Sequence, residues 1–172
     1  MAEPRNASVP ASTFSDNKQS IKSTITDVIS ELDSITAIKE EQEYALVEFL
    51  SGADVLAVLP TGFGKSLIYQ LAPLVTKRMS PDSNPIFIII SPLTELMKDQ
   101  VKEAEKLGIT AMRLGVDANS DKAIEEGRCQ LVFGSPETWL LNKKWRDMLA
   151  GSVYRENIKG IVVDEVHVTY KW

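Results

Sequence analysis

The chain has 172 residues, 44% hydrophobic and 25% charged, which suits one globular domain with a sizeable core. A net charge of −5 argues against a generally basic surface, and we interpret the one notable basic cluster (Lys143, Lys144 and Arg146) as a solvated face. We expect an intracellular protein, because no apolar run approaches the roughly 20 residues of a membrane span and no secretion signal opens the chain. The single cysteine, Cys129, excludes an internal disulfide and a cysteine-based zinc cluster.

The N-terminal part of the chain divides into a tail and two predicted helices. Residues 1–20 are rich in Ser, Ala, Asn and Pro without periodicity, which predicts a disordered tail before one domain over 21–172. From Ile21 to Ile35 the apolar residues recur at helical spacing, which indicates an amphipathic helix. A second helix is expected over 39–50, ending at Ser51 and Gly52.

From residue 55 onward, short apolar runs alternate with helical patterns. We expect strands at 55–60, 86–91, 109–114, 129–133 and 158–165, and helices at 65–79, 93–107 and from Pro136. The run at 55–60 is predicted to be a strand buried on both faces, and Pro73 should kink or shorten the 65–79 helix. Such alternation predicts an α/β fold, with a mainly parallel sheet covered by helices on both faces and ligands at the carboxyl ends of its strands.

A glycine-rich turn lies between the predicted strand at 55–60 and the predicted helix at 65–79. It contains, in order, Thr61, Gly62, Phe63, Gly64, Lys65 and Ser66. Backbone N–H groups of such a turn can cradle phosphate oxygens, while the lysine bridges the β- and γ-phosphates and the serine hydroxyl reaches magnesium. Leu59 replaces the first glycine of the strict phosphate-loop pattern, and a glycine-rich turn can also precede a helix by chance. The strand before the turn and the helix after it favour nucleotide binding.

Two carboxylates follow the last predicted strand. Asp164 can hold magnesium, usually through water, and Glu165 can orient and deprotonate an attacking water. Asp-Glu after a strand can also be a solvated strand exit, and His167 can be an ordinary core or surface histidine. The catalytic interpretation is favoured because both carboxylates follow a buried strand in a chain that already carries a phosphate loop.

Four segments resemble, in order, motifs I, Ia, Ib and II of RecQ-type superfamily 2 helicases: LPTGFGKSLIYQ, SPLTELMKDQV, FGSPETWL and VVDEVHVTYKW. The resemblance covers residues 38–172. DEAD-box RNA helicases are less similar, because they carry PTRELA-like and TPGR segments where this chain has SPLTELMKDQ and GSPE. The resemblance implies a RecA-like P-loop NTPase lobe that uses ATP and Mg²⁺. It also implies an ATP-dependent 3′–5′ DNA helicase, acting on single-stranded or forked DNA in nuclear repair or recombination.

The resemblance assigns roles to four residues whose local sequence alone does not indicate them. Gln42 stands where the family keeps a glutamine that reads the adenine edge, although a lone glutamine on a charged helix can equally be solvated surface. Ser91–Pro92 and Ser135–Pro136 are expected to open helices, with Ser as N-cap and Pro as first helical residue. In the family, these turns meet the phosphates of single-stranded DNA, so Ser91, Pro92 and Ser135 become candidate DNA contacts.

The chain ends at Trp172, so the expected lobe is incomplete at its C-terminus. In the family a motif III strand stands between the equivalents of 55–59 and 160–164, and we therefore expect these segments not to pair directly. The second lobe, which supplies arginines to the transferring phosphate, is also expected to be missing. Two functions stay open: the ATP-binding part of a helicase that does not unwind alone, or a non-catalytic module that binds ATP or nucleic acid.

Overall fold

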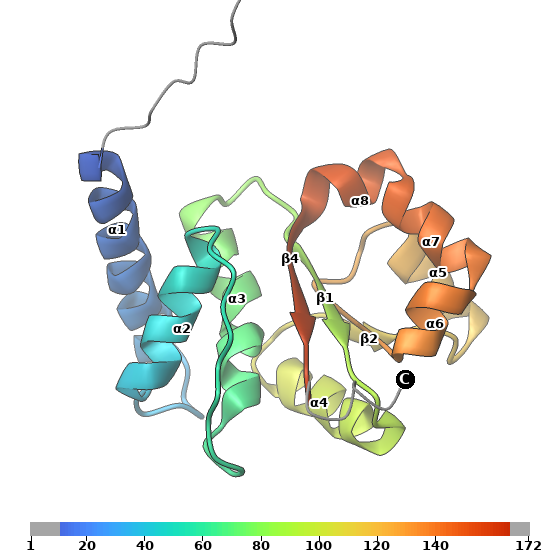
Figure 1. Cartoon of the computed structure of the whole chain (residues 1–172), viewed down its shortest axis with the longest axis horizontal. Helices are drawn as coiled ribbons and strands as arrows, with labels where there is room; N and C mark the ends of the chain where they lie inside the picture. Colours follow the sequence, from blue (N-terminus) through green and yellow to red (C-terminus); the bar gives the residue numbers. More distant parts are fainter. Residues whose placement is uncertain (1–10, 166–172) are drawn as a thin grey trace, which may run out of the picture.

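Four parallel strands form a sheet with helices against both faces in the computed structural model, which describes residues 11–165 (Figure 1). The elements are α1 (Ala11–Ser30), α2 (Glu40–Leu50), α3 (Lys65–Met79), β1 (Ile86–Ile90), α4 (Thr94–Lys106), β2 (Ala111–Arg113), α5 (Ala118–Glu125), β3 (Leu131–Gly134), α6 (Pro136–Leu141), α7 (Lys143–Ala150), α8 (Ser152–Asn157) and β4 (Ile158–Val163). The strand order is β2-β3-β1-β4. This architecture confirms the predicted fold class.

The central strand β1 separates two hydrophobic cores. Phe87 and Ile89 point into the core shared with α1 to α4, whereas Ile86 and Ile88 point into the core beneath α5 to α8. This alternation follows from the two-residue period of a strand, and it explains why IFIII is apolar at every position. In Figure 1, α1, α2 and α3 lie on one side of the strands and α5 to α8 on the other.

The predicted boundary of the disordered tail is wrong, because α1 begins at Ala11 and residues 11–20 are helical. The helix buries Ile21 and Ile25 against the core, as its apolar stripe predicted. Its first half is tied to α2 where the Lys18 Nζ donates to Glu48 Oε1 at 2.7 Å. The polar composition of residues 11–20 therefore did not predict this part of the helix, which an ion pair joins to α2. Residues 1–10 lie outside the described part of the chain.

The strand predicted at 55–60 does not form. This segment is an extended coil along α2 and α3, and Leu56 and Val58 are 78% and 84% exposed (Figure 1). A buried strand needs partners at its edges, and within residues 11–165 strand β4 pairs only with β1. No direct pairing between 55–59 and 160–164 exists, as expected from the resemblance.

The remaining elements agree with the predicted order, with one further correction and three additions. Pro73 does not end α3, which continues to Met79 with Leu71 and Val75 fully buried on either side. Burial of both flanking turns outweighs the hydrogen bond that a proline cannot make. Helices α5, α7 and α8 were not predicted, because each is eight residues or shorter. Between residues 11 and 165, no helix combines the length and apolar character of a membrane span.

Candidate functional site

The loop before α3 turns sharply at two glycines. Gly62 and Gly64 have φ angles of +78° and +87°, in the left-handed region that residues with a Cβ rarely adopt. Gly64 is the N-cap residue of α3, and no side chain caps the helix there, so its first N–H groups are left for a ligand. Thr61 and Gly62 are exposed, whereas Lys65 and Ser66, which begin α3, are half-buried. The loop has the shape of an anion cradle.

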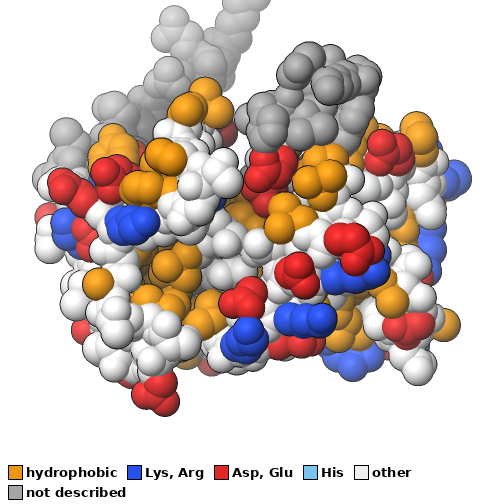
Figure 2. Space-filling model, turned by 90° about the horizontal axis from the view of Figure 1, so that it is seen from below, with side chains coloured by type: hydrophobic (Ala, Val, Ile, Leu, Met, Phe, Trp, Pro, Cys, Tyr) orange, Lys and Arg blue, Asp and Glu red, His pale blue; other side chains and the backbone are white. Residues whose placement is uncertain are grey.

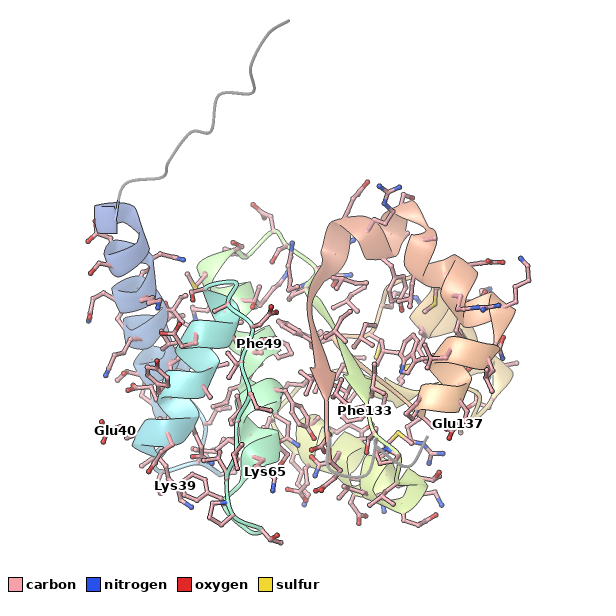
Figure 3. The ribbon with its side chains drawn as sticks, in the orientation of Figure 1. Lys39, Glu40, Phe49, Lys65, Phe133 and Glu137 are labelled. Atoms are coloured by element: carbon pink, nitrogen blue, oxygen red, sulfur yellow. The ribbon has the colours of Figure 1, made fainter. Side chains whose placement is uncertain are left out.

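Side chains at the start of α2 donate hydrogen bonds to the carbonyl groups of this loop. The buried Gln42 amide donates to the carbonyl oxygens of Phe63 at 3.0 Å and Gly64 at 2.9 Å. Its Oε1 accepts the Lys39 N–H at 2.9 Å, so Gln42 satisfies the backbone donor of the N-cap residue of α2. The Lys39 Nζ donates to Phe63 O at 3.1 Å and lies 4.0 Å from the centre of the Phe63 ring. Figure 3 shows Lys39 and Lys65 at the same end of the molecule.

These contacts bear on two interpretations of Gln42: a solvated surface side chain, or a side chain that contacts adenine. The solvated-surface alternative is wrong, because the side chain is 3% exposed. The hydrogen bonds of the amide are directed at the loop in this structure, and a contact with adenine stays a prediction. The predicted link between Gln42 and the nucleotide site therefore runs through Phe63 and Gly64, whose carbonyl groups it fixes.

The second half of the site is the carboxyl end of β4. The Asp164 N–H donates to Ile90 O at 2.8 Å, which extends the β1–β4 ladder by one residue and fixes the backbone. One oxygen of the Asp164 carboxylate accepts the Glu165 N–H at 2.9 Å, and the other accepts the Tyr69 hydroxyl at 3.3 Å. Burial raises the pKa of Asp164 above its usual range, while the Lys65 charge opposes that rise.

Glu165 adopts a left-handed backbone with φ of +53°, the only non-glycine residue to do so among those described. Such a conformation costs on the order of 1 kcal/mol and is concentrated at functional sites. The residue lies directly beyond the end of β4, in the turn that follows the strand. The pair of carboxylates is thus set at the sheet edge by a regular strand followed by one strained residue.

A cavity of about 560 Å³ connects Lys65, at the start of α3, with Asp164 and Glu165. Tyr69 and Asp54 complete its polar lining, and its apolar walls come from the other residues of 53–59 and from 161–163. The Lys65 ammonium donates to Leu59 O at 3.3 Å. Another cavity, of about 600 Å³, lies between α2 and the 55–59 coil and contains none of these five polar residues. The chemistry therefore belongs to the former cavity.

The serine–proline turns behave differently from each other. Ser135 is the N-cap of α6 and its Oγ accepts the Thr138 N–H at 3.2 Å, as predicted. The capping prediction for Ser91 is wrong, because α4 begins at Thr94 with Leu93 as its N-cap. The Ser91 N–H instead donates to Gly134 O at 3.1 Å, and its buried hydroxyl has no partner within the described residues.

Ser91 therefore turns no hydrogen-bonding side-chain group to the surface, whereas Pro92 is half-buried and Ser135 stands at a helix start. The sheet explains the difference, because the β1–β3 ladder extends through Ser91 and delays the start of α4. DNA contacts at Pro92 and Ser135 stay predictions, and the Ser91 hydroxyl is not positioned for one.

Several basic side chains on the described surface are paired with acidic ones, so they do not form a broad basic surface there. Lys143 pairs with Asp147 at 2.5 Å, and Lys144 pairs with Glu125 at 2.6 Å, which agrees with a solvated, ion-paired face. Figure 2 shows basic and acidic side chains interspersed over the face seen from below, with hydrophobic side chains in a hollow of the same face. His167, the remaining motif II residue considered above, lies outside the described residues.

Tyr69 is a polar residue of the site that the sequence motifs did not predict. It lies one helical turn after Lys65, so the i, i+4 spacing could have placed both on one side of α3. Its partner Asp164 is 95 residues away, and no local pattern connects the two.

Comparison with known proteins gives the family of the chain. A sequence model described as DEAD/DEAH box helicase matches residues 39–172. A putative ATP-dependent DNA helicase Q1 from Caenorhabditis briggsae is 33% identical over 139 residues, which is 76% of this chain and 21% of the relative. The ATP-dependent DNA helicase RecQ of Haemophilus influenzae is 29% identical over 161 residues, covering 88% of this chain and 23% of the relative. The chain thus spans about a fifth to a quarter of these curated relatives.

Solved structures agree at the level of the fold. The DUF1998 helicase MrfA, bound to DNA and AMPPNP, superposes with a TM-score of 0.67 at 22% identity, covering 97% of this chain and 23% of that one. The DEAD-box helicase Mss116, bound to ssRNA and UDP-BeF, gives a TM-score of 0.55 at 18% identity, covering 86% of this chain and 40% of that one. With its curated relatives named as RecQ-type ATP-dependent DNA helicases and its sheet folded as a RecA-like helicase lobe, the chain belongs to the DEAD/DEAH box helicase family.

Proposed function

We propose that this chain is the ATP-binding part of an ATP-dependent DNA helicase, with its nucleotide site between the α3 loop and the end of β4. The observation that carries this proposal is the cavity that joins Lys65 to Asp164 and Glu165. The N–H groups at the start of α3 would bind phosphate oxygens, and the Lys65 ammonium would leave Leu59 O to bridge the β- and γ-phosphates. Thr61, Gly62, Phe63 and Gly64 form the loop whose backbone approaches the phosphates.

The residues present fit a magnesium ion held jointly with the nucleotide. Asp164 offers carboxylate oxygens at the cavity wall, and Ser66 offers a hydroxyl on the first turn of α3. Among residues 11–165 no cluster of three or more acidic, histidine or cysteine side chains could hold a metal alone. That donor set suits Mg²⁺, which usually takes one or two protein oxygens and completes its shell with water and phosphate. The ion would neutralise charge that develops on the transferring phosphoryl group.

Glu165 is the proposed general base for hydrolysis. It lines the same cavity as Lys65 and follows Asp164 directly, so its carboxylate would orient a water and accept its proton. The positive φ of Glu165 supports this role, because left-handed non-glycine residues are concentrated at functional sites.

The action on DNA is proposed for the whole protein. The curated relatives carry names that include ATP-dependent DNA helicase, and the MrfA structure contains DNA. We propose binding of single-stranded or forked DNA, 3′–5′ unwinding of duplex DNA, a nuclear location and a role in repair or recombination, as the RecQ resemblance implies. Pro92 and Ser135 are the proposed phosphate contacts, because their turns stand at the carboxyl ends of β1 and β3.

Nucleotide titration tests the proposal. A fluorescent ATP analogue with Mg²⁺ should bind the wild-type chain, and Lys65→Ala should weaken binding at least about tenfold, since a charged hydrogen bond to phosphate contributes about 1.5–3 kcal/mol. Lys106→Ala is the matched control, because Lys106 is an exposed lysine of α4 paired with Glu103. Equal affinities for wild type and Lys65→Ala would overturn the assignment of the phosphate site.

A further inference from the structure

Tyr69 is a buried tyrosine whose hydroxyl faces a carboxylate of the nucleotide site. The side chain is 4% exposed, and its ring packs edge-on against Phe133 of β3, with ring centres 6.3 Å apart and planes at 68°. The hydroxyl donates to Asp164 Oδ2 at 3.3 Å and lines the same cavity as Lys65. Figure 3 places Phe133 within the sheet, which lies between the two helical layers. The ring is thus held by the core while only its polar tip reaches the site.

Direction of the hydrogen bond is fixed by the protonation state of the phenol. A phenol hydroxyl keeps its proton at neutral pH, so the Tyr69 hydroxyl donates. The carboxylate can only accept when it is ionised. The distance of 3.3 Å is at the long end for a hydroxyl–carboxylate hydrogen bond.

The carboxylate of Asp164 has few other constraints. Its backbone is fixed by the N–H bond to Ile90 O, and Oδ1 accepts the N–H of the next residue, Glu165. The Glu165 N–H holds Oδ1 from the adjacent residue of the chain, and neither of these two contacts reaches Oδ2. The Tyr69 hydroxyl is the contact from another element that selects one orientation, because it approaches Oδ2 from α3.

We propose that Tyr69 is a positioning residue, which orients the carboxylate of Asp164 for the magnesium ion that accompanies ATP. This inference rests on the proposed function, because it needs Asp164 to act on the metal. Lys65 and Tyr69 are one turn apart on α3, so a single helix would place the ammonium that binds phosphate and the hydroxyl that aligns the metal-binding carboxylate. Groups that orient a metal-binding side chain by hydrogen bonds typically change metal affinity when removed.

A different explanation is that the hydroxyl of Tyr69 merely satisfies its own need for a partner inside the core. That explanation predicts lower stability without any change in the dependence on Mg²⁺. Tyr154 provides the matched control, because it is also a fully buried tyrosine, and its hydroxyl donates to Ile124 O at 2.7 Å in the other hydrophobic core. Both tyrosines can be changed to Phe, which keeps the ring and removes only the hydroxyl.

The experiment is a Mg²⁺ titration of fluorescent ATP analogue binding, performed on the 172-residue wild-type chain and on Tyr69→Phe, Tyr154→Phe and Asp164→Asn. Affinity without Mg²⁺, in EDTA, is measured for each variant. We expect Tyr69→Phe to raise the Mg²⁺ concentration for half-maximal effect about three- to tenfold, which corresponds to losing one hydrogen bond. Affinity in EDTA should stay within about twofold of wild type, and Tyr154→Phe should leave both quantities unchanged while lowering the unfolding midpoint.

Each other outcome overturns the inference in a recognisable way. If Asp164→Asn shifts the Mg²⁺ requirement but Tyr69→Phe does not, Tyr69 has no positioning role and the proposed function stands. If Tyr69→Phe and Tyr154→Phe shift the requirement equally, the effect is structural. If Asp164→Asn itself causes no shift, the metal role of Asp164 is wrong, and the inference falls with that part of the proposed function.

Discussion

Replacing Gly64 with alanine tests how closely α2 supports the phosphate loop. The new methyl group would lie 2.7 Å from the Gln42 Nε2, and φ at this position is +87°. The left-handed backbone costs about 1–2 kcal/mol for a residue with a Cβ. Displacing the Gln42 amide also weakens its bonds to the Phe63 and Gly64 carbonyls, at about 0.5–1.5 kcal/mol each. Gly64→Ala should therefore lower the free energy of unfolding by about 2–5 kcal/mol.

Gly62→Ala is the matched control, because φ there is +78° but no atom lies within 4 Å of the added methyl group. It should cost only the backbone part, about 1–2 kcal/mol. Urea unfolding followed by the fluorescence of the buried Trp139 and Trp145 would measure both variants. In a Gln42→Ala background the excess cost of Gly64→Ala should fall to within about 0.5 kcal/mol of the control. Equal costs in the wild-type background, or an excess that persists without the glutamine, would refute the reasoning.

Three further predictions concern other parts of the molecule. In any longer version of this protein that hydrolyses ATP, Glu165→Gln should abolish turnover while ATP-analogue affinity stays within about threefold, because the residue acts on water; a loss of both would contradict this role. Burial raises the pKa of the Cys129 thiol to about 12, so a thiol reagent at pH 8 should label the folded chain only after urea is added, and fast labelling of native protein would contradict the buried position. Ile161 on β4 is 58% exposed beside a strand edge that pairs with no other strand among residues 11–165, and Ile161→Lys should reduce concentration-dependent association in analytical ultracentrifugation, whereas an unchanged association would show that the edge is not responsible.

The parts of the fold that sequence could predict are those decided by local patterns. Uninterrupted apolar runs such as IFIII and LVFG form parallel strands. The glycine-rich turn directly precedes a helix, as the phosphate-loop pattern predicted. The Ser135 cap also follows from adjacent residues alone. These features depend on few neighbours, so a single sequence contains enough information to predict them.

Errors arose where a distant segment decides the outcome. The 55–60 run is as apolar as a buried strand, yet it remains a coil because no described strand pairs with it. Ser91 precedes a proline like a helix cap, but pairing with Gly134 keeps it in the ladder. Residues 11–20 are polar and form part of α1, whose apolar stripe begins only at Ile21, and the bond from Lys18 to Glu48 joins this part to α2.

The candidate site shows the same division between local and distant information. Lys65, Asp164 and Glu165 were predicted from motifs, and the structure places them around one cavity. The contact between Tyr69 and Asp164 joins residues 95 positions apart, so only the folded chain reveals it. Gln42 was placed near the nucleotide by resemblance, while its bonds to the loop carbonyls became visible only in three dimensions.

The hydrogen bonds from Gln42 have a kinetic consequence. They fix the loop from its carbonyl side during folding, so little conformational freedom is lost when a nucleotide arrives. Association should then proceed in one step, with an observed rate constant that rises linearly with nucleotide concentration and no slower isomerisation phase. The same bonds join the loop to α2, so an occupied loop should slow amide hydrogen exchange in the first turn of that helix, at Glu43, whose N–H donates to Lys39 O at 2.9 Å.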